Sequence, residues 1–165
     1  MAKTLDVTWR YGFTGDYVDD TDLNESRGTL PYSDTVTLAT GTAAAQARYQ
    51  WYDTRTLAAT AEELDLAGGV TDAFGDALTF TKVRHLMIHN RNTTAGHILT
   101  VGPGTTNGVT TIWAGTSPTE ICGADGYLIK DSPTDGYVIT GGSADTIKIN
   151  AGTNTVSYDI IVVGT

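Results

Sequence analysis

The sequence is short of charged residues and of cysteine, and both shortages exclude classes of protein. Only 18% of the 165 residues are charged, and the single cysteine, Cys122, excludes an internal disulfide. The 10 basic residues are outnumbered by 19 acidic ones and form no run, whereas nucleic-acid binding needs a basic surface that displaces counterions from phosphates. We therefore expect no nucleic-acid partner.

Long apolar stretches are also missing. No segment approaches the roughly 20 apolar residues that span a bilayer, and a net charge of −9 disfavours anionic membranes. The N-terminal residues MAKTLDVTWRYGF lack the apolar segment of a secretory signal. We expect a protein with no membrane partner, made and used without secretory export.

Threonine and glycine take the place of the missing residues. Thr favours strands because its branched Cβ is stiff, and the 19 glycines supply the backbone freedom of tight turns. Short segments typical of strands recur about every ten residues, at 35–38, 48–52, 62–66, 78–90, 97–101, 126–130, 136–140, 145–150 and 156–163. This spacing predicts an all-β fold, an antiparallel β-sandwich of jelly-roll type over residues 35–165.

The segment 78–90 contains two conflicting phases of alternation. Phe80 and Ile88 share one phase, whereas Val83 and Met87 share the other. Either a β-bulge or burial on both faces in the second half of the strand would reconcile them.

Residues 1–34 differ from the rest of the chain. Acidic and turn-forming residues dominate positions 12–34, which predicts an irregular N-terminal arm. Its apolar residues are spaced as anchors for a neighbouring subunit, namely Trp9, Tyr11, Phe13, Tyr17 and Leu30. The alternative is a strand and loop packed on the chain's own sandwich, and the sequence leaves both open.

Metal-binding patterns are incomplete. His85 and His89 lie four residues apart on a strand, which places them about 13 Å apart on one face, too far to share one zinc ion. The segment Asp20–Ser26 alternates oxygen ligands as calcium loops do, but Glu25 stands where such a loop needs glycine. We expect no metal site.

The chain also lacks the motifs of familiar enzymes. It has no Gly-x-Ser-x-Gly elbow and no phosphate-binding loop, and Gly102–Gly104 and Gly141–Gly142 are expected to be turns. Cys122 has no evident activating partner and is expected to be buried and inert. We expect no enzyme and no cofactor, although folding could bring together the two carboxylates that a glycoside hydrolase needs.

The tryptophans complete the set of candidate contact residues. Trp51 lies in an aromatic strand and is expected to face the core, whereas Trp113 lies among Thr and Gly residues and is a candidate contact residue. With Trp113, the candidate protein-contact residues are Trp9, Tyr11, Phe13 and Tyr17.

Several segments resemble a group of small virion proteins of tailed phages. They are Tyr52–Ala59, Glu63–Gly68, Thr71–Gly75, Leu78–Val83, Asn92–His97, Thr134–Gly141, Asp145–Ile149 and Val156–Ile160. The resemblance covers about residues 47–163 and leaves the N-terminal arm outside.

Among such phage proteins, jelly-roll members often act as trimeric cement proteins on the capsid. The resemblance therefore implies a decoration protein, made in the host cytoplasm, that binds the major capsid protein on the outer surface of the virion as a homotrimer. The alternative is a tail, baseplate or fibre module that binds host-surface carbohydrate.

Overall fold

The computed structural model describes residues 4–21, 24–113 and 118–165, and within them the chain is built from strands and turns. The strands are β1 (Val7–Thr21), β2 (Asn24–Thr40), β3 (Gln46–Ala47), β4 (Tyr49–Ala58), β5 (Ala61–Asp65), β6 (Ala67–Thr71), β7 (Ala77–Thr79), β8 (Lys82–Asn90), β9 (Leu99–Pro103), β10 (Glu120–Cys122), β11 (Tyr127–Asp131), β12 (Tyr137–Val138), β13 (Thr146–Asn150) and β14 (Thr155–Gly164). The described residues contain no helix able to cross a membrane.

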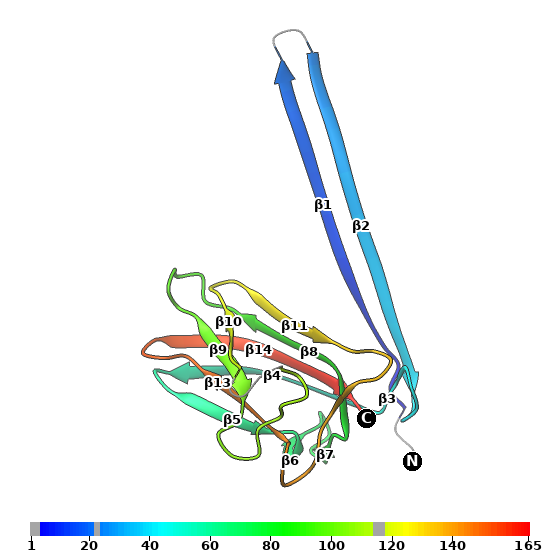
Figure 1. Cartoon of the computed structure of the whole chain (residues 1–165), viewed down its shortest axis with the longest axis vertical. Helices are drawn as coiled ribbons and strands as arrows, with labels where there is room; N and C mark the ends of the chain where they lie inside the picture. Colours follow the sequence, from blue (N-terminus) through cyan, green and yellow to red (C-terminus); the bar gives the residue numbers. More distant parts are fainter. Residues whose placement is uncertain (1–3, 22–23, 114–117) are drawn as a thin grey trace.

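Two antiparallel sheets form the body of the molecule (Figure 1). One has the strand order β10-β9-β13-β5, and the other has the order β11-β8-β14-β4, with β12 also paired to β8. Side chains from both sheets meet in one hydrophobic core. The prediction of an all-β, antiparallel sandwich is confirmed.

Alternation of apolar and polar residues explains why one face of β13 and one face of β14 point into the core. Ile147 and Ile149 of β13 are fully buried, and so are Tyr158 and Ile160 of β14. The residues between them are only partly buried, because successive strand residues point to opposite faces of a sheet.

The conflicting phases in 78–90 have two structural causes. Residues 80 and 81 separate β7 from β8, and Arg84 is an extra residue in the β8–β14 pairing, where Val163 is opposite His85 but Gly164 is opposite Val83. The predicted bulge is therefore present. Burial on both faces also occurs, in residues 83–86, which lie at the start of β8 and around the middle of the predicted segment 78–90.

The bulged Arg84 is buried, and its guanidinium is held by backbone oxygens of two loops. It donates to the carbonyl oxygen of Ala43 at 3.0 Å and to that of Thr134. These bonds tie β8 to the loop before β3 and to the loop before β12.

The N-terminal arm is a regular structure, and the prediction of an irregular extension is wrong. β1 and β2 pair continuously from Val7–Leu38 to Thr21–Asn24 as one long antiparallel hairpin. Each strand supplies the backbone partners of the other, so the Gly, Thr and Asp residues are accommodated in the ladder. The boundary expected at residue 34 falls inside β2.

The hairpin projects away from the sandwich, and only its base is attached (Figure 1). Leu38 packs with Ala47 and Val163, and Thr40 joins β2 to the start of β1 through its hydroxyl, which accepts from the Leu5 amide at 2.7 Å. The predicted packing of this segment on the chain's own sandwich thus holds at the hairpin base, whereas the predicted contact of its apolar residues with a neighbouring subunit remains a prediction.

Candidate protein-contact surface

Strand register divides the hairpin into an apolar face and a polar face. Residues at odd positions in β1 pair with residues at even positions in β2, as Trp9 with Val36 and Phe13 with Tyr32, so their side chains share a face. The apolar face contains Val7, Trp9, Tyr11, Phe13, Tyr17, Leu30, Tyr32, Val36 and Leu38.

The opposite face of the hairpin is polar and is bonded to itself. The hydroxyls of Thr8 and Thr37 lie 3.1 Å apart across the ladder, and Thr29 donates to Asp16 at 2.7 Å. The hairpin is therefore amphipathic over the residues whose side chains are described, 7–18 and 27–38, with the exposed Val18 as an apolar residue on its polar face.

The outer part of the apolar face is uncovered. The exposed fractions are 63% for Phe13, 75% for Tyr17, 73% for Leu30 and 59% for Tyr32. Large apolar side chains at such exposures, gathered on one face, mark surfaces that bind other molecules. We name these four residues the hairpin patch.

The inner part of the same face is already used. The indole of Trp9 lies over the ring of His85 with 4.7 Å between ring centroids, and Val7, Trp9 and Val36 pack around Leu38 and Val163. The apolar face of the hairpin thus begins as a contact with the outer side of the sheet β11-β8-β14-β4 and continues outward without a partner.

Burial keeps the histidine of this inner contact uncharged at neutral pH. His85 is buried beneath Trp9, and its Nδ1 contacts the carboxylate of Asp131. Burial lowers the pKa of His85 below its ordinary value and raises the pKa of Asp131. The imidazole is therefore neutral and donates its Nδ1 proton to Asp131.

A second apolar surface adjoins the hairpin base. Tyr52, Ile161, Met87 and Ile129 are neighbours across β4, β14, β8 and β11, and all four point away from the core. Tyr52 is 66% exposed and Ile129 is 41% exposed, whereas Met87 and Ile161 are partly covered. We name these four residues the sheet row.

The next row across the same sheet is polar. His89 stacks on Tyr127 with ring centroids 4.1 Å apart, and its ring nitrogens lie 3.5 Å from Asp125 and 3.6 Å from Asp159. The apolar surface of the sheet is thereby restricted to the side nearest the hairpin.

The structure brings together four of the five predicted contact residues. Trp9, Tyr11, Phe13 and Tyr17 lie on one face of the hairpin, the first two half-buried near its base and the last two exposed. The prediction that Trp113 is a contact residue is wrong, because this side chain is only 2% exposed and belongs to the core of the sandwich. Its burial prevents it from contacting another protein in this conformation.

Tyr32 is a contact candidate that sequence reasoning missed. Leu30, Tyr32, Val36 and Leu38 alternate with polar residues, a period-two pattern that predicts a strand. Reading 24–40 as one strand would have placed Tyr32 beside Phe13. Trp51, expected in the core, is buried there.

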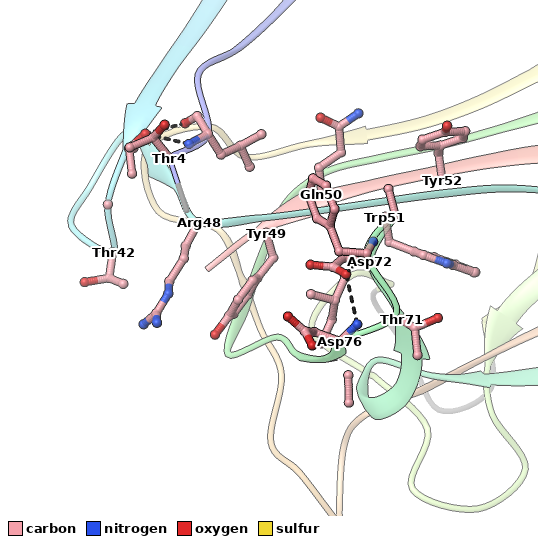
Figure 2. Close-up of a pocket in the computed structure, with 17 residues that line it drawn as sticks. Thr4, Thr42, Arg48, Tyr49, Gln50, Trp51, Tyr52, Thr71, Asp72 and Asp76 are labelled. Carbon is pink, nitrogen blue, oxygen red and sulfur yellow. Dashed lines mark hydrogen bonds between the residues drawn. The ribbon is translucent and has the colours of Figure 1, made fainter. Parts of the chain in front are cut away.

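A broad pocket of about 950 Å³ opens at the base of the hairpin (Figure 2). Tyr49 and Tyr52 of β4 line it together with Phe74 of the β6–β7 turn, and Arg48 and Asp72 contribute charge. Asp72 is engaged in its own loop, because its carboxylate accepts the amides of Phe74 at 2.9 Å and Asp76 at 3.0 Å. Among the described residues, the lining of this pocket supplies aromatic rings and hydroxyls but no His or Cys side chain.

The other candidates for chemistry have structural partners. Glu62 pairs with Arg55 and accepts a bond from the Tyr158 hydroxyl at 2.5 Å, and Arg55 also binds Asp53 at 2.8 Å. Cys122 is buried as predicted, and burial raises the pKa of its thiol. This keeps the sulfur protonated and unreactive.

The described residues contain no group of three metal-binding side chains. His85 and His89 engage separate carboxylates, Asp131 for the first and Asp125 and Asp159 for the second. The predicted calcium-like segment Asp20–Ser26 includes residues 22 and 23, which lie outside the described residues, and the side chains of 19–26 are likewise not described.

Known proteins do not identify the chain. No family model matches it, and no match is found among curated proteins or among solved structures. Function is therefore inferred from the hairpin patch, the sheet row and the pocket.

Proposed function

We propose that this protein is a decoration, or cement, protein of a tailed phage. It binds the major capsid protein on the outer surface of the shell, as a homotrimer, and stabilises the virion after synthesis in the host cytoplasm. The observation that carries the proposal is the hairpin, which projects from a compact sandwich and presents an uncovered apolar face.

The physics of the hairpin supports a role in protein binding. A two-stranded hairpin is marginally stable alone in water, yet β1 is 15 residues long and is attached to the body only at its base. At about 3.4 Å per residue it extends about 48 Å. An element of this length with an aromatic face gains stability when a protein surface covers it.

The connectivity of the sandwich supports the jelly-roll part of the proposal. Apart from the two-residue β12, which also pairs with β8, eight strands form the two sheets. Numbering these eight along the chain gives the orders 1-8-3-6 and 2-7-4-5. In four pairs of consecutive strands the two members belong to opposite sheets, namely β4–β5, β8–β9, β10–β11 and β13–β14. Such alternation between two antiparallel sheets is what a folded-over Greek key produces.

A capsid shell offers the kind of partner that such a subunit needs. It presents the same binding site many times, and its threefold positions favour cyclic trimers. The net charge of −9 keeps the free subunit soluble before assembly. Attachment then depends on apolar surfaces such as the hairpin patch.

The pocket at the hairpin base favours a second candidate function. The aromatic rings of its lining, Phe74 above all because it is 81% exposed, are suited to stacking against a sugar ring. A tail, baseplate or fibre module that binds host-surface carbohydrate would use this pocket, and its copy number in the virion would be far lower.

Co-sedimentation with shells tests the proposal. The purified protein is mixed with capsids of the phage that encodes it, stripped of this chain, and with isolated tails. Saturable binding at hundreds of copies per capsid is the expected result. Binding to tails alone would overturn the decoration proposal.

Paired variants then test the hairpin. Phe13→Ser with Tyr17→Ser removes two aromatic side chains from the exposed face, whereas Thr14→Ala with Ser33→Ala changes the polar face of the same region. Only the first pair should weaken attachment. Equal binding by both variants would exclude the hairpin patch as a contact surface.

A further inference from the structure

We infer that the hairpin patch binds the sheet row of a second copy of this chain, so that neighbouring subunits exchange their hairpins. The inference rests on the proposed function for the homotrimer, because it places the hairpin patch at the contact between the subunits of that trimer. Removal of the patch would then weaken attachment to the shell because the trimer that attaches comes apart. The partner surface of the patch is made of Tyr52, Ile161, Met87 and Ile129.

The chain already contains a contact of this type. At the hairpin base, Trp9 and Leu38 pack on the outer side of the sheet β11-β8-β14-β4, against His85 and Val163. The sheet row lies on the same side of the same sheet, one row farther along its strands. The hairpin patch is the continuation of the face that makes the internal contact. An exchanged hairpin would therefore extend an existing interface.

The two surfaces agree in size. Phe13 and Tyr17 are four residues apart in β1, which is about 14 Å at about 3.4 Å per residue. The sheet row crosses four neighbouring strands, or three spacings of about 4.8 Å, which is also about 14 Å. A hairpin lying across these strands, as in orthogonal packing of sheets, would match the two surfaces end to end.

The two surfaces also agree in charge. The residues of the sheet row are uncharged, and so are Phe13, Gly15, Tyr17, Gly28, Leu30 and Tyr32 along the outer apolar face of the hairpin. Two copies that each have a net charge of −9 repel one another unless they meet through uncharged surfaces. Gly28 leaves open space opposite Tyr17, into which a protruding side chain of the partner fits.

A second copy covers both surfaces at once. Each chain has one hairpin patch and one sheet row, so a closed dimer or trimer leaves neither exposed. An unrelated partner on the hairpin would leave Tyr52 and Ile129 uncovered. Because each chain has one hairpin patch and one sheet row, we assign the partner as another copy of the chain.

Cross-linking between differently tagged copies tests the exchange. One copy carries Tyr17→Cys and the other carries Ile129→Cys, both in a Cys122→Ala background, and a short bismaleimide joins thiols that lie close together. A control copy carries Thr14→Cys, which is on the polar face of the hairpin. Circular dichroism verifies that every variant is folded.

The inference predicts strong linkage of Tyr17→Cys to Ile129→Cys and little linkage of the Thr14→Cys control. It also predicts that Phe13→Ser with Tyr17→Ser weakens self-association about a hundredfold or more, measured by analytical ultracentrifugation, since two central aromatics are removed. Linkage of Tyr17→Cys only to itself, or a monomeric wild-type protein at tens of micromolar, would overturn the inference. Shell binding by a monomeric protein would support attachment to the capsid but contradict the homotrimer, whereas an exchanged oligomer that does not bind shells would support the inference alone, so the two can fail separately.

Discussion

Glu62 joins the two sheets at one edge of the sandwich, and its removal is predicted to destabilise the fold. Glu62 lies on β5 in one sheet, whereas its partners Arg55 and Tyr158 lie on β4 and β14 in the other. Tyr158 is fully buried. Burial first, and its bond to Glu62 second, raise the pKa of this phenol, so it remains a donor throughout the accessible pH range.

The size of the effect follows from what each partner loses. Glu62→Ala leaves the buried Tyr158 hydroxyl without its acceptor, which costs about 1–3 kcal/mol. Arg55 is about one-third exposed and keeps Asp53, so its loss is about 1 kcal/mol or less. We therefore expect Glu62→Ala to lower the free energy of unfolding by about 1–4 kcal/mol.

Urea denaturation of a double-mutant cycle measures this contribution. Tyr158→Phe removes the hydroxyl and leaves Glu62 paired with Arg55, so alone it should cost about 1–2 kcal/mol. In the Tyr158→Phe background, Glu62→Ala should cost clearly less than in the wild type, because no orphaned hydroxyl remains. Equal costs in both backgrounds, or a cost of Glu62→Ala below about 0.5 kcal/mol, would refute this reasoning.

Three further predictions concern the hairpin base and the bulge. Burial lowers the pKa of His85 in the folded protein below 6.5, so as the pH falls His85 takes up a proton in the unfolded chain before it does so in the folded one. The free energy of unfolding should therefore be full above about pH 6.5 and decline as the pH falls toward the folded pKa. His85→Gln should flatten this decline in urea midpoints between pH 7 and pH 5, and an unchanged slope would contradict the assignment. Gly164→Ala should lower the free energy of unfolding by more than about 2 kcal/mol, because a Cβ there would lie 2.0 Å from the Lys82 carbonyl oxygen. The control Gly152→Ala meets open space and should cost only about 1 kcal/mol for its positive φ, so equal urea midpoints for the two variants would disprove the close approach. Leu38→Ala creates a cavity in the small cluster at the hairpin base, so it should speed hydrogen exchange of the hairpin amides while the amides of β14 stay protected. Uniform acceleration would show that the hairpin and the sandwich unfold together.

The sandwich was predictable because its strands are amphipathic over short distances. Ile147 and Ile149 alternate with polar residues in a segment bounded by turns, and the conflicting phases around Val83 correctly indicated a bulge. Such alternation patterns are local, so they can be recognised without knowledge of which strands pair.

The hairpin was missed because its Gly and acidic residues outweigh its apolar ones in any short window. The period-two pattern of Trp9, Tyr11 and Phe13 was visible, but the partner strand was needed to show that it continues to Tyr32. A two-stranded ladder has no core of its own, so composition alone suggests an irregular segment.

The sheet row and the position of Trp113 depend on tertiary structure. Tyr52, Met87, Ile129 and Ile161 come from four segments of the chain and become neighbours only through strand register. Trp113 lies in a segment without periodicity, where nothing local indicates that it points into the core. Sequence patterns identify which residues are apolar, but register decides which of them meet.

Cryo-electron microscopy of the intact virion tests the central claim most directly. We predict density for this chain as repeated knobs on the outer capsid lattice, with the hairpin patch of each copy covered by protein. Density confined to the tail, or hairpins that extend into solvent with Phe13 and Tyr17 uncovered, would contradict the account.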